Sequence, residues 1–249
     1  MIIDAHAYIG FSHRRYPPRI RSTDELVGVM DKFGITRACV SSMMGIQYDF
    51  RRGNREVHDE AAKFPGRFIP FCVVHPRYWS EAEPELLECV TRFGFRGLAL
   101  HPTEHVFAAD CLSARRIVGA AQSLGIPVAI HSSEEDLAHP NRIGALAAAF
   151  PSTTFIMYHM GRFAWQEAIE VASERLNILL DTTDASCHDG LVEKAAERVG
   201  AERVVWGSGL PVSYPGPNLT RILIARLSER ERELVLGKNV AKLFETNRA

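Results

Sequence analysis

The chain has 249 residues, and its 29 basic and 30 acidic side chains leave a formal net charge of −1. This balance argues against nucleic acid or an anionic membrane surface as the main partner. No apolar run is long enough to span a bilayer, and the N-terminus lacks the basic and apolar regions of a signal peptide, so we expect a cytoplasmic protein. Five scattered cysteines without Cys-x-x-Cys spacing argue against a disulfide framework or a structural zinc site.

The first predicted strand is the start of the chain, from Met1 to Gly10. Side chains alternate between the two faces of a strand, so Asp4, His6 and Tyr8 are expected on the same side. An acid, a histidine and a phenol in one row are the material of an active site. We therefore expect later strands to add their own polar ends to this row.

Short apolar runs then alternate with longer amphipathic segments. Ser22, Ser80 and Ser228 each precede a glutamate by three residues, the capping-box spacing that predicts the start of a helix. Glycines such as Gly34 predict where helices end. The predicted strands lie at Ile2–Ile3, Ala38–Ser41, Phe68–Val74, Gly97–Leu100, Pro127–Ile130, Thr154–Tyr158, Ile178–Leu180 and Arg203–Trp206.

Eight strands that alternate with helices, at roughly thirty residues per unit, predict an α/β fold of the (β/α)8 TIM-barrel type. A doubly wound open sheet is the competing interpretation, but no glycine-rich phosphate turn follows the first strand. Neither a Pro/Gly/Ser-rich linker nor a shift in composition divides the chain. We therefore expect one barrel domain over residues 1–249.

Histidines gather where the predicted strands end. In a (β/α)8 barrel, catalytic residues lie at the C-terminal ends of the strands. A single strand-end histidine is usually a hydrogen-bonded core or surface residue, whereas five of the ten histidines at one face are hard to explain by packing alone. We expect a shared barrel mouth formed by Asp4, Tyr8 and these histidines. The five histidines are His6, His75, His101, His131 and His159.

Sequence motifs over nearly the whole chain share their order with a known family. They are Asp4-Ala5-His6, Phe64-Pro65-Gly66-Arg67-Phe68, Phe93-Gly94-Phe95-Arg96-Gly97, Leu100-His101-Pro102, Ile126-Pro127-Val128-Ala129-Ile130-His131, Tyr158-His159-Met160-Gly161, Arg203-Val204-Val205-Trp206-Gly207-Ser208 and Gly237-Lys238-Asn239-Val240-Ala241-Lys242-Leu243-Phe244. Each motif alone is weak, and their common order is specific. The sequence resembles the amidohydrolase superfamily, in particular its branch related to aminocarboxymuconate-semialdehyde decarboxylase.

The resemblance implies a divalent metal site in the barrel mouth. In the family, a His-x-His pair on the first strand, a histidine on the fifth and an aspartate on the eighth bind the metal, and a sixth-strand histidine assists. His6, His131 and His159 match this pattern, but Tyr8 replaces the second histidine and Gly209 replaces the aspartate. The resemblance therefore implies a weakened site, with His6, His131 and His159 as candidate ligands and zinc as the expected ion if a metal binds.

Two further arrangements are open for the metal and for catalysis. Asp181 or Asp184 could supply a ligand from the seventh strand, or both could be structural. Without a metal, the cluster could work by general acid–base chemistry, because histidine titrates near neutral pH and a phenol can donate to an oxyanion. The candidate catalytic residues are His159, Tyr8 and His131.

Basic side chains near the mouth suggest the kind of substrate. Arg14 lies in the loop after the first strand and Arg162 follows His159, so both could bind a carboxylate in a bidentate manner. We take Arg14, Arg162 and His101 as candidate substrate-binding residues. Solvated loop arginines are an equally good interpretation of each arginine.

Three functional interpretations follow. The favoured one is an enzyme, either a hydrolase of a C–N or lactone bond or a carbon–carbon lyase such as a decarboxylase, acting on a small carboxylated molecule. The alternative is a catalytically altered or inactive relative that binds a small ligand without metal chemistry. A purely structural or interaction protein fits least well, because the polar strand ends are retained. We expect a small molecule as the partner, and a homo-oligomer is compatible with the sequence.

Overall fold

The strands of the sheet follow the order of the chain. The computed structural model describes residues 1–10, 20–185, 188 and 190–245. Within these ranges eight strands form one sheet in the order β1 to β8, and all neighbouring pairs are parallel. The strands are β1 (Ile2–Ile9), β2 (Ile35–Ser42), β3 (Phe68–Val73), β4 (Gly97–Leu100), β5 (Val128–His131), β6 (Phe155–Tyr158), β7 (Ile178–Asp181) and β8 (Val204–Val205).

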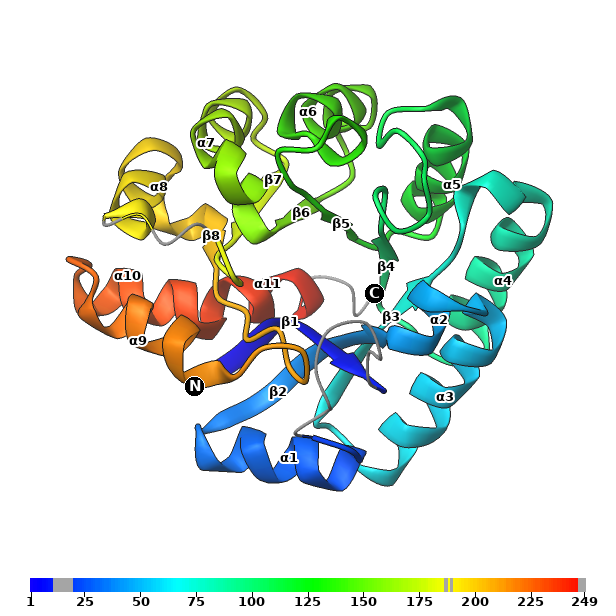
Figure 1. Cartoon of the computed structure of the whole chain (residues 1–249), viewed down its shortest axis with the longest axis horizontal. Coiled ribbons are helices and arrows are strands. Elements are labelled where there is room, and N and C mark those ends of the chain that lie inside the picture. The colour runs from blue at the N-terminus through cyan, green and yellow to red at the C-terminus, as the bar shows by residue number, and fades with distance from the viewer. Residues whose placement is uncertain (11–19, 186–187, 189, 246–249) are drawn as a thin grey trace.

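Backbone hydrogen bonds join β1 to the segment that directly follows β8 and bring the two edges of the sheet together. The amide of Ala5 donates to the carbonyl of Trp206 at 2.9 Å, and the amide of Tyr8 donates to the carbonyl of Leu210 at 2.7 Å. Parallel neighbours need crossover connections, which here are helical. Figure 1 shows these helices as an outer ring around the strands, and the predicted (β/α)8 barrel is confirmed.

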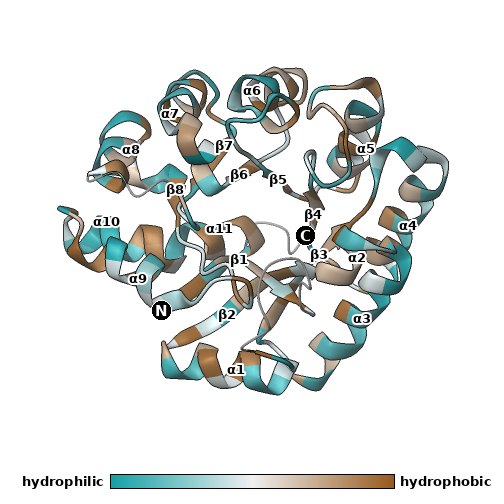
Figure 2. Cartoon of the chain, viewed as in Figure 1, coloured by the Kyte–Doolittle hydropathy of each residue, from teal (hydrophilic) through white to brown (hydrophobic). Residues whose placement is uncertain are grey.

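The helices of the outer ring are amphipathic. In α1, Leu26, Val27 and Met30 are buried while Glu25 and Asp31 are exposed, which is the spacing of a helix with one apolar side. Figure 2 shows hydrophilic and hydrophobic residues side by side on the same helices. The helices are α1 (Thr23–Lys32), α2 (Met43–Gln47), α3 (Phe50–Lys63), α4 (Trp79–Thr91), α5 (Leu112–Ser123), α6 (Pro140–Ala149), α7 (Trp165–Glu174), α8 (Leu191–Val199), α9 (Pro215–Ile224), α10 (Glu229–Glu233) and α11 (Asn239–Glu245).

Two of the three predicted serine caps are confirmed. The hydroxyl of Ser22 accepts from the amide of Glu25, and Ser228 forms a complete capping box with Glu231. The prediction for Ser80 is wrong, because α4 begins before it at Trp79 and has no side-chain cap. A short 3-10 turn over Pro76–Tyr78 leads directly into α4, so the serine falls inside the first helical turn.

An apolar cluster fills the inside of the barrel and leaves one end for polar groups. The Phe71 ring meets the Phe244 ring of α11 edge-on, with centroids 6.3 Å apart. A Cβ at Gly97 would stand 2.3 Å from the Phe71 ring, so only glycine fits there. Arg96, which precedes β4, donates to the carbonyl of Phe244 at 3.3 Å. Helix α11 therefore covers the barrel interior at the N-terminal ends of the strands, opposite the predicted site.

The membrane and cysteine expectations can be examined in the same ranges. Among the described helices, none combines the length and apolar character needed to cross a bilayer. Cys39, Cys72, Cys89 and Cys111 are free thiols. Cys187 lies outside the described residues.

Candidate active site

Five aromatic side chains form a closed circle at the C-terminal mouth of the barrel. We call them the ring of five: His6, Tyr8, His101, His131 and His159. Two come from β1, one ends β5, and the other two directly follow β4 and β6. Centroids of neighbouring rings are 4.8 Å apart for His6–His159, 4.5 Å for His159–His131, 5.7 Å for His131–His101, 6.3 Å for His101–Tyr8 and 5.0 Å for Tyr8–His6. The structure thus brings together the catalytic candidates, the candidate metal-binding histidines and His101.

Both ring nitrogens of His6 have hydrogen-bond partners. Nδ1 lies 2.9 Å from Oδ2 of Asp181, and Nε2 lies 2.5 Å from the phenol oxygen of Tyr8. An ionised carboxylate can only accept, so Nδ1 carries the proton. In the neutral ring, Nε2 then has a lone pair that accepts a hydrogen bond from the Tyr8 hydroxyl. The result is a continuous hydrogen-bonded chain from Asp181 through His6 to Tyr8.

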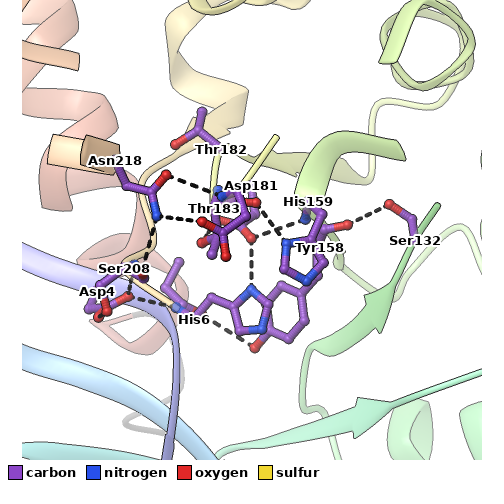
Figure 3. A network of polar contacts seen from close by, with 12 residues as sticks. Asp4, His6, Ser132, Tyr158, His159, Asp181, Thr182, Thr183, Ser208 and Asn218 are labelled. Atoms are coloured by element: carbon purple, nitrogen blue, oxygen red, sulfur yellow. Dashed lines mark hydrogen bonds and ion pairs between the residues drawn. The ribbon is translucent and has the colours of Figure 1, made fainter. Parts of the chain in front are cut away.

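Asp181 is the anchor of this chain. Its Oδ2 accepts from His6 Nδ1 and from the backbone amide of His159 at 3.2 Å. Its Oδ1 accepts from the amide and hydroxyl of Thr183 at 3.1 and 2.7 Å. Burial alone raises the pKa of Asp181, but the hydrogen bond from His6 and the nearby His6 and His159 rings outweigh it and lower that pKa. The carboxyl is therefore ionised, and Figure 3 shows it between the two histidines.

His6 is also held by stacking. Its ring lies flat on the ring of Tyr158, with centroids 3.5 Å apart and an angle of 8° between the planes. The Tyr158 hydroxyl donates to the carbonyl of Ala5 at 3.3 Å, and His6 itself is fully buried. Stacking on one side and the Asp181 tether on the edge fix the orientation of the imidazole.

His159 sits in a strained turn. Its φ is 62°, and the next three residues, 160–162, also have positive φ values. Non-glycine residues in this region cost free energy, and such positions cluster at functional sites. The turn is held through Ser132, whose hydroxyl donates to the Tyr158 carbonyl at 2.5 Å and accepts from the Gly161 amide at 2.8 Å. Figure 3 shows Ser132 beside this turn.

A backbone contact fixes the tautomer of His159. Nδ1 lies 2.7 Å from the carbonyl oxygen of Thr183, which can only accept, so Nδ1 carries the proton. Nε2 is consequently a free base in the neutral ring. Burial, the His6 ring and the Arg162 guanidinium lower the pKa of His159 to about 3, against a smaller opposing effect of Asp181. His159 is therefore neutral at neutral pH, with Nε2 unprotonated.

Burial sets the charge of the other ring members as well. It lowers the pKa of His101 and His131 well below the ordinary value of 6.5, and the neighbouring histidines add to the effect. It raises the pKa of Tyr8 well above 10, with help from nearby carboxylates. Nε2 of His101 and Nδ1 of His131 have no hydrogen-bond partner among the described residues. The site thus offers neutral imidazoles and a protonated phenol.

Asp4 faces the strand that closes the barrel. Oδ1 accepts from the amides of His6 and Ser208, both at 2.9 Å, and Oδ2 accepts from the Ser208 hydroxyl. Burial raises the pKa of Asp4 to about 7, although the bonds from Ser208 and His6 oppose it. Figure 3 shows this pair next to His6. Asp4 therefore ties β1 to the segment after β8 and supports the site from outside the ring of five.

The candidate substrate-binding arginines differ in what can be said of them. Arg162 is half-buried, its Nε has no partner within the described ranges, and its charge contributes to the lowered pKa of both His131 and His159. Its positive charge thus acts on the ring of five. Arg14 lies outside the described residues.

One predicted mouth histidine joins a different group. His75 stacks on His105, with centroids 4.5 Å apart and planes at 9°. His105 is positioned by the Ile46 carbonyl, 3.0 Å from its Nε2, and these side chains border a separate cavity of about 450 Å³ together with Glu104. Sequence reasoning missed His105, because it lies inside a loop rather than at a strand end.

Three residues form a group with the composition of a metal site. One donor atom each from His6, His159 and Asp181 lies within 4.8 Å of the others, and all three residues are buried. Two imidazoles and an ionised carboxylate fit a divalent metal. The cluster can therefore hold a divalent metal, with Asp181 supplied by the seventh strand. His131 borders His159 but is not part of this group among the described residues.

Gly209 cannot easily be replaced by a metal-binding aspartate. Its φ is +73°, a region that L side chains rarely adopt, and a Cβ there would stand 3.0 Å from Thr183 Cγ2 and 3.2 Å from Asp184 Oδ2. Asp184 itself is exposed and is held by Ser213 and Asn218. The two acids considered from the sequence thus have different surroundings, and Asp181 is the one inside the cluster.

The geometry and the fold agree with a family assignment. A family model described as Amidohydrolase matches residues 3–246. The chain therefore belongs to the amidohydrolase family, and the predicted resemblance is confirmed at that level. No curated protein matches the sequence.

Solved structures of the same fold cover nearly the whole chain. A 2,6-dihydroxybenzoate decarboxylase from Rhizobium has a TM-score of 0.82 and 17% identity, covering 99% of both chains. A dihydroxybenzoic acid decarboxylase from a Polaromonas species, with bound manganese and an inhibitor, has a TM-score of 0.78 and 20% identity, covering 100% of this chain and 98% of its own. A probable 2-pyrone-4,6-dicarboxylic acid hydrolase from Acinetobacter baumannii has a TM-score of 0.72 and 16% identity, covering 98% and 99%.

Proposed function

We propose that this amidohydrolase hydrolyses or decarboxylates a small carboxylated organic molecule at the C-terminal mouth of the barrel. The ring of five carries this proposal, because it combines neutral imidazoles and a protonated phenol in one buried place, on which the charge of the half-buried Arg162 also acts. The decarboxylases and the hydrolase of similar fold act on carboxylated compounds by name, which supports the same substrate class here.

Arg162 is the proposed carboxylate-binding group. Its Nε has no partner among the described residues, so a bound anion would satisfy a buried donor. Guanidinium and carboxylate groups pair through two parallel hydrogen bonds, which also orients the substrate. His101, with an unpartnered Nε2, lies across the ring and is proposed as a second contact. Arg14 remains part of the proposal on sequence grounds.

His159 is the proposed general base, with His131 beside it. The Thr183 carbonyl holds the proton on Nδ1, which leaves Nε2 free to take a proton from water or substrate. The lowered pKa of His159 keeps Nε2 unprotonated at neutral pH, and the nearby Asp181 carboxylate, which acts in the opposite sense on this pKa, would stabilise the ring once it takes up a proton. His131 packs on it edge-on and is also neutral, so it can accept or donate a hydrogen bond to the same substrate group.

Tyr8 is proposed to take part in proton transfer through its hydroxyl group. A carboxylate that holds an imidazole, which in turn holds a hydroxyl, is the arrangement that activates hydroxyl groups in hydrolases. Here Asp181 fixes His6, and His6 accepts the Tyr8 proton. The phenol oxygen can thus become more basic without the free enzyme holding a phenolate.

A divalent metal would be held by His6, His159 and Asp181. Such an ion polarises carbonyl groups and lowers the pKa of bound water. Zinc is the ion we propose, because imidazoles and a carboxylate are its usual oxygen and nitrogen ligands. We also propose a cytoplasmic protein with a small-molecule partner, and we keep a homo-oligomer as compatible with the sequence.

A substrate survey tests the proposal. Purified protein, with and without added Zn²⁺ or Mn²⁺, is assayed for CO2 release from carboxylated aromatic acids and for acid production from carboxylated lactones. Turnover of one of these classes supports the proposal. If folded protein binds such acids but turns over neither class under any of these conditions, the ligand-binding alternative replaces it.

A further inference from the structure

We propose that a cavity beside the ring of five is a second binding site, which takes a small organic cation with a primary ammonium group on an aromatic body. We call it the second cavity, and its volume is about 450 Å³. The lining residues that carry the proposal are Tyr48, His75, Tyr78, Glu104 and His105. Binding there requires neither the proposed reaction nor a metal ion.

The second cavity is separated from the ring of five by the turn that follows β4. The amide of His105 donates to the carbonyl of His101 at 3.0 Å and closes this turn, and the centroids of the two imidazoles are 6.2 Å apart. His101 belongs to the ring of five, whereas His105 lines the second cavity. No member of the ring of five is among the described residues that line the second cavity. A ligand there thus has a place of its own.

Two lining side chains carry acceptor atoms without a partner. His105 is 6% exposed, and its Nε2 lies 3.0 Å from the carbonyl of Ile46, which can only accept, so Nε2 carries the proton. Burial and the neighbouring His75 lower the pKa of His105 to about 4, so the ring is neutral and Nδ1 has a lone pair. This Nδ1 and Oε2 of Glu104 have no hydrogen-bond partner within the described ranges. Unpaired acceptors favour a ligand that brings N–H donors.

Aromatic rings form much of the wall of the second cavity. His75 stacks on His105 with planes at 9°, and Tyr78 meets His75 edge-on with centroids 4.8 Å apart. Tyr48 is 70% exposed and lines the cavity where it opens to solvent. Phenol rings attract a cation over their faces, and an aromatic body can stack on flat side chains. The wall therefore suits an aromatic molecule that carries a positive charge.

Charge favours a cation over an anion. Three acidic residues line the second cavity against one basic residue, namely Asp49, Glu81 and Glu104 against Arg51. Arg51 lies 3.3 Å from Glu81, so these two charges offset each other and two carboxylates remain. Arg77, whose charge acts on His75, is not among the lining residues. An ammonium group is thus the complementary partner, and Glu104, which is half-buried, is the carboxylate we assign to it.

Size and donor placement favour an organic cation over a bare metal ion. A volume of about 450 Å³ lies in the usual range of small-molecule sites, roughly 300–1,000 Å³. In the part of the chain that the structure describes, three metal-binding side chains converge only at His6, His159 and Asp181. The second cavity therefore lacks the converging donors that a metal ion needs, and it has room for a ring.

Titration calorimetry with benzylammonium chloride at neutral pH tests this proposal without any substrate. The wild type should bind benzylammonium roughly tenfold or more tighter than benzyl alcohol, a neutral molecule of the same size, because only the cation pairs with Glu104. Benzyltrimethylammonium keeps the charge but has no N–H group, so it should bind more weakly than benzylammonium. Absent binding of benzylammonium, equal binding of the alcohol, or tighter binding of the quaternary ion overturns the proposal.

Variants show where the cation binds. Glu104→Gln keeps the shape of the side chain and removes its charge, so benzylammonium should bind roughly fivefold or more weakly. Glu135→Gln is the matched control, because Glu135 is exposed, accepts from Thr103 on the same turn and does not line the second cavity. Its affinity should stay within about twofold of the wild type. Unchanged affinity in folded Glu104→Gln, or an equal loss in Glu135→Gln, overturns the proposal.

A second variant covers a poorly folded Glu104→Gln protein. Tyr48→Ala removes an exposed ring, so the fold should be kept, and benzylammonium should bind roughly threefold or more weakly because a cation–aromatic contact is lost. Wild-type affinity in Tyr48→Ala would contradict the assigned place of the cation. Absence of turnover in the substrate survey would remove the proposed function and leave these results untouched.

Discussion

His159 and Thr183 are joined by a hydrogen bond of 2.7 Å between imidazole Nδ1 and a backbone carbonyl. This one contact decides which nitrogen of His159 is a base. It comes from the segment after β7, so the neighbouring strand sets the chemistry of the residue that follows β6. The roles proposed for the ring of five depend on such contacts between neighbouring strand ends, and the following predictions test them one by one.

Asp181→Asn should lower turnover at least a hundredfold once a substrate is known. The amide can turn its NH2 toward His6 and favour the wrong tautomer, as loss of the acid does in other carboxylate–imidazole–hydroxyl arrangements. Asp184→Asn is the matched control, because Asp184 is exposed and contacts Ser213 and Asn218 instead of His6. Comparing kcat of the two variants measures how much the hydrogen bonds from Asp181 through His6 to Tyr8 contribute to turnover. Equal kcat values would contradict the proposed role of these bonds.

Arg162→Gln should raise KM for a carboxylated substrate roughly tenfold or more, since a charge-assisted bidentate pair is lost. Arg162→Lys keeps the charge but not the paired geometry, so its KM should fall between those of wild type and Arg162→Gln. Steady-state kinetics at constant ionic strength give these values. An unchanged KM in Arg162→Gln would assign carboxylate binding to another group.

Stability should fall as the pH is lowered from about 6.5 toward 4. Burial lowers the pKa of His101, His131 and His159, the last to about 3, so the unfolded chain binds more protons in this window and unfolding becomes easier. Asp4 acts in the opposite sense, because its pKa rises from 3.8 to about 7 and stability from this group is lost as the pH rises through that range. The three histidines together take up more protons on unfolding than Asp4 releases, so the net effect of lower pH is a loss of stability.

Urea unfolding at a series of pH values measures how steeply the free energy of unfolding depends on pH. His159→Gln should make this dependence weaker, by at most the equivalent of one proton taken up on unfolding. Asp4→Asn should make it steeper. A wild-type free energy of unfolding that stays constant or increases between about pH 6.5 and about pH 4 would contradict the neutral state of the buried histidines.

Gly209→Ala should destabilise the fold by about 1–2 kcal/mol, because glycine tolerates the positive φ and the crowded space there and alanine does not. Gly28→Ala is the control in the middle of α1, where an added Cβ meets no described atom within 4 Å. That change should stabilise by about 0.5–1 kcal/mol. Thermal or urea unfolding gives both values, and equal stability of the two variants would contradict the strain at Gly209.

The barrel and the convergence of its strand ends could be predicted from the sequence. Alternating apolar runs and capped helices gave the order of the elements, and parallel strands bring their C-terminal ends to one mouth. This is why His6, His101, His131 and His159 could be expected near each other without any structure. The backbone of the His159 turn could not, since four consecutive positive φ values depend on the tertiary contacts of Ser132.

The chemistry inside the mouth was less predictable. The sequence raised Asp181 only as one of two alternatives, because side-chain contacts across strands depend on register and rotamer. The stacking of His6 on Tyr158 and the pairing of His75 with His105 carry no signal in residue spacing. The bond between Tyr8 and His6 follows from their i, i+2 positions on β1 only when the ring orientations are known.

The kcat of His159→Ala tests the central claim most directly, namely that the ring of five performs the reaction through His159. His58→Ala is the control, because His58 lies on α3 and packs on Phe93, outside the ring of five. With a substrate from the survey, His159→Ala should lower kcat roughly a hundredfold or more, the usual contribution of a general acid–base group, and His58→Ala should keep the wild-type value. Full activity in a correctly folded His159→Ala protein would contradict the account.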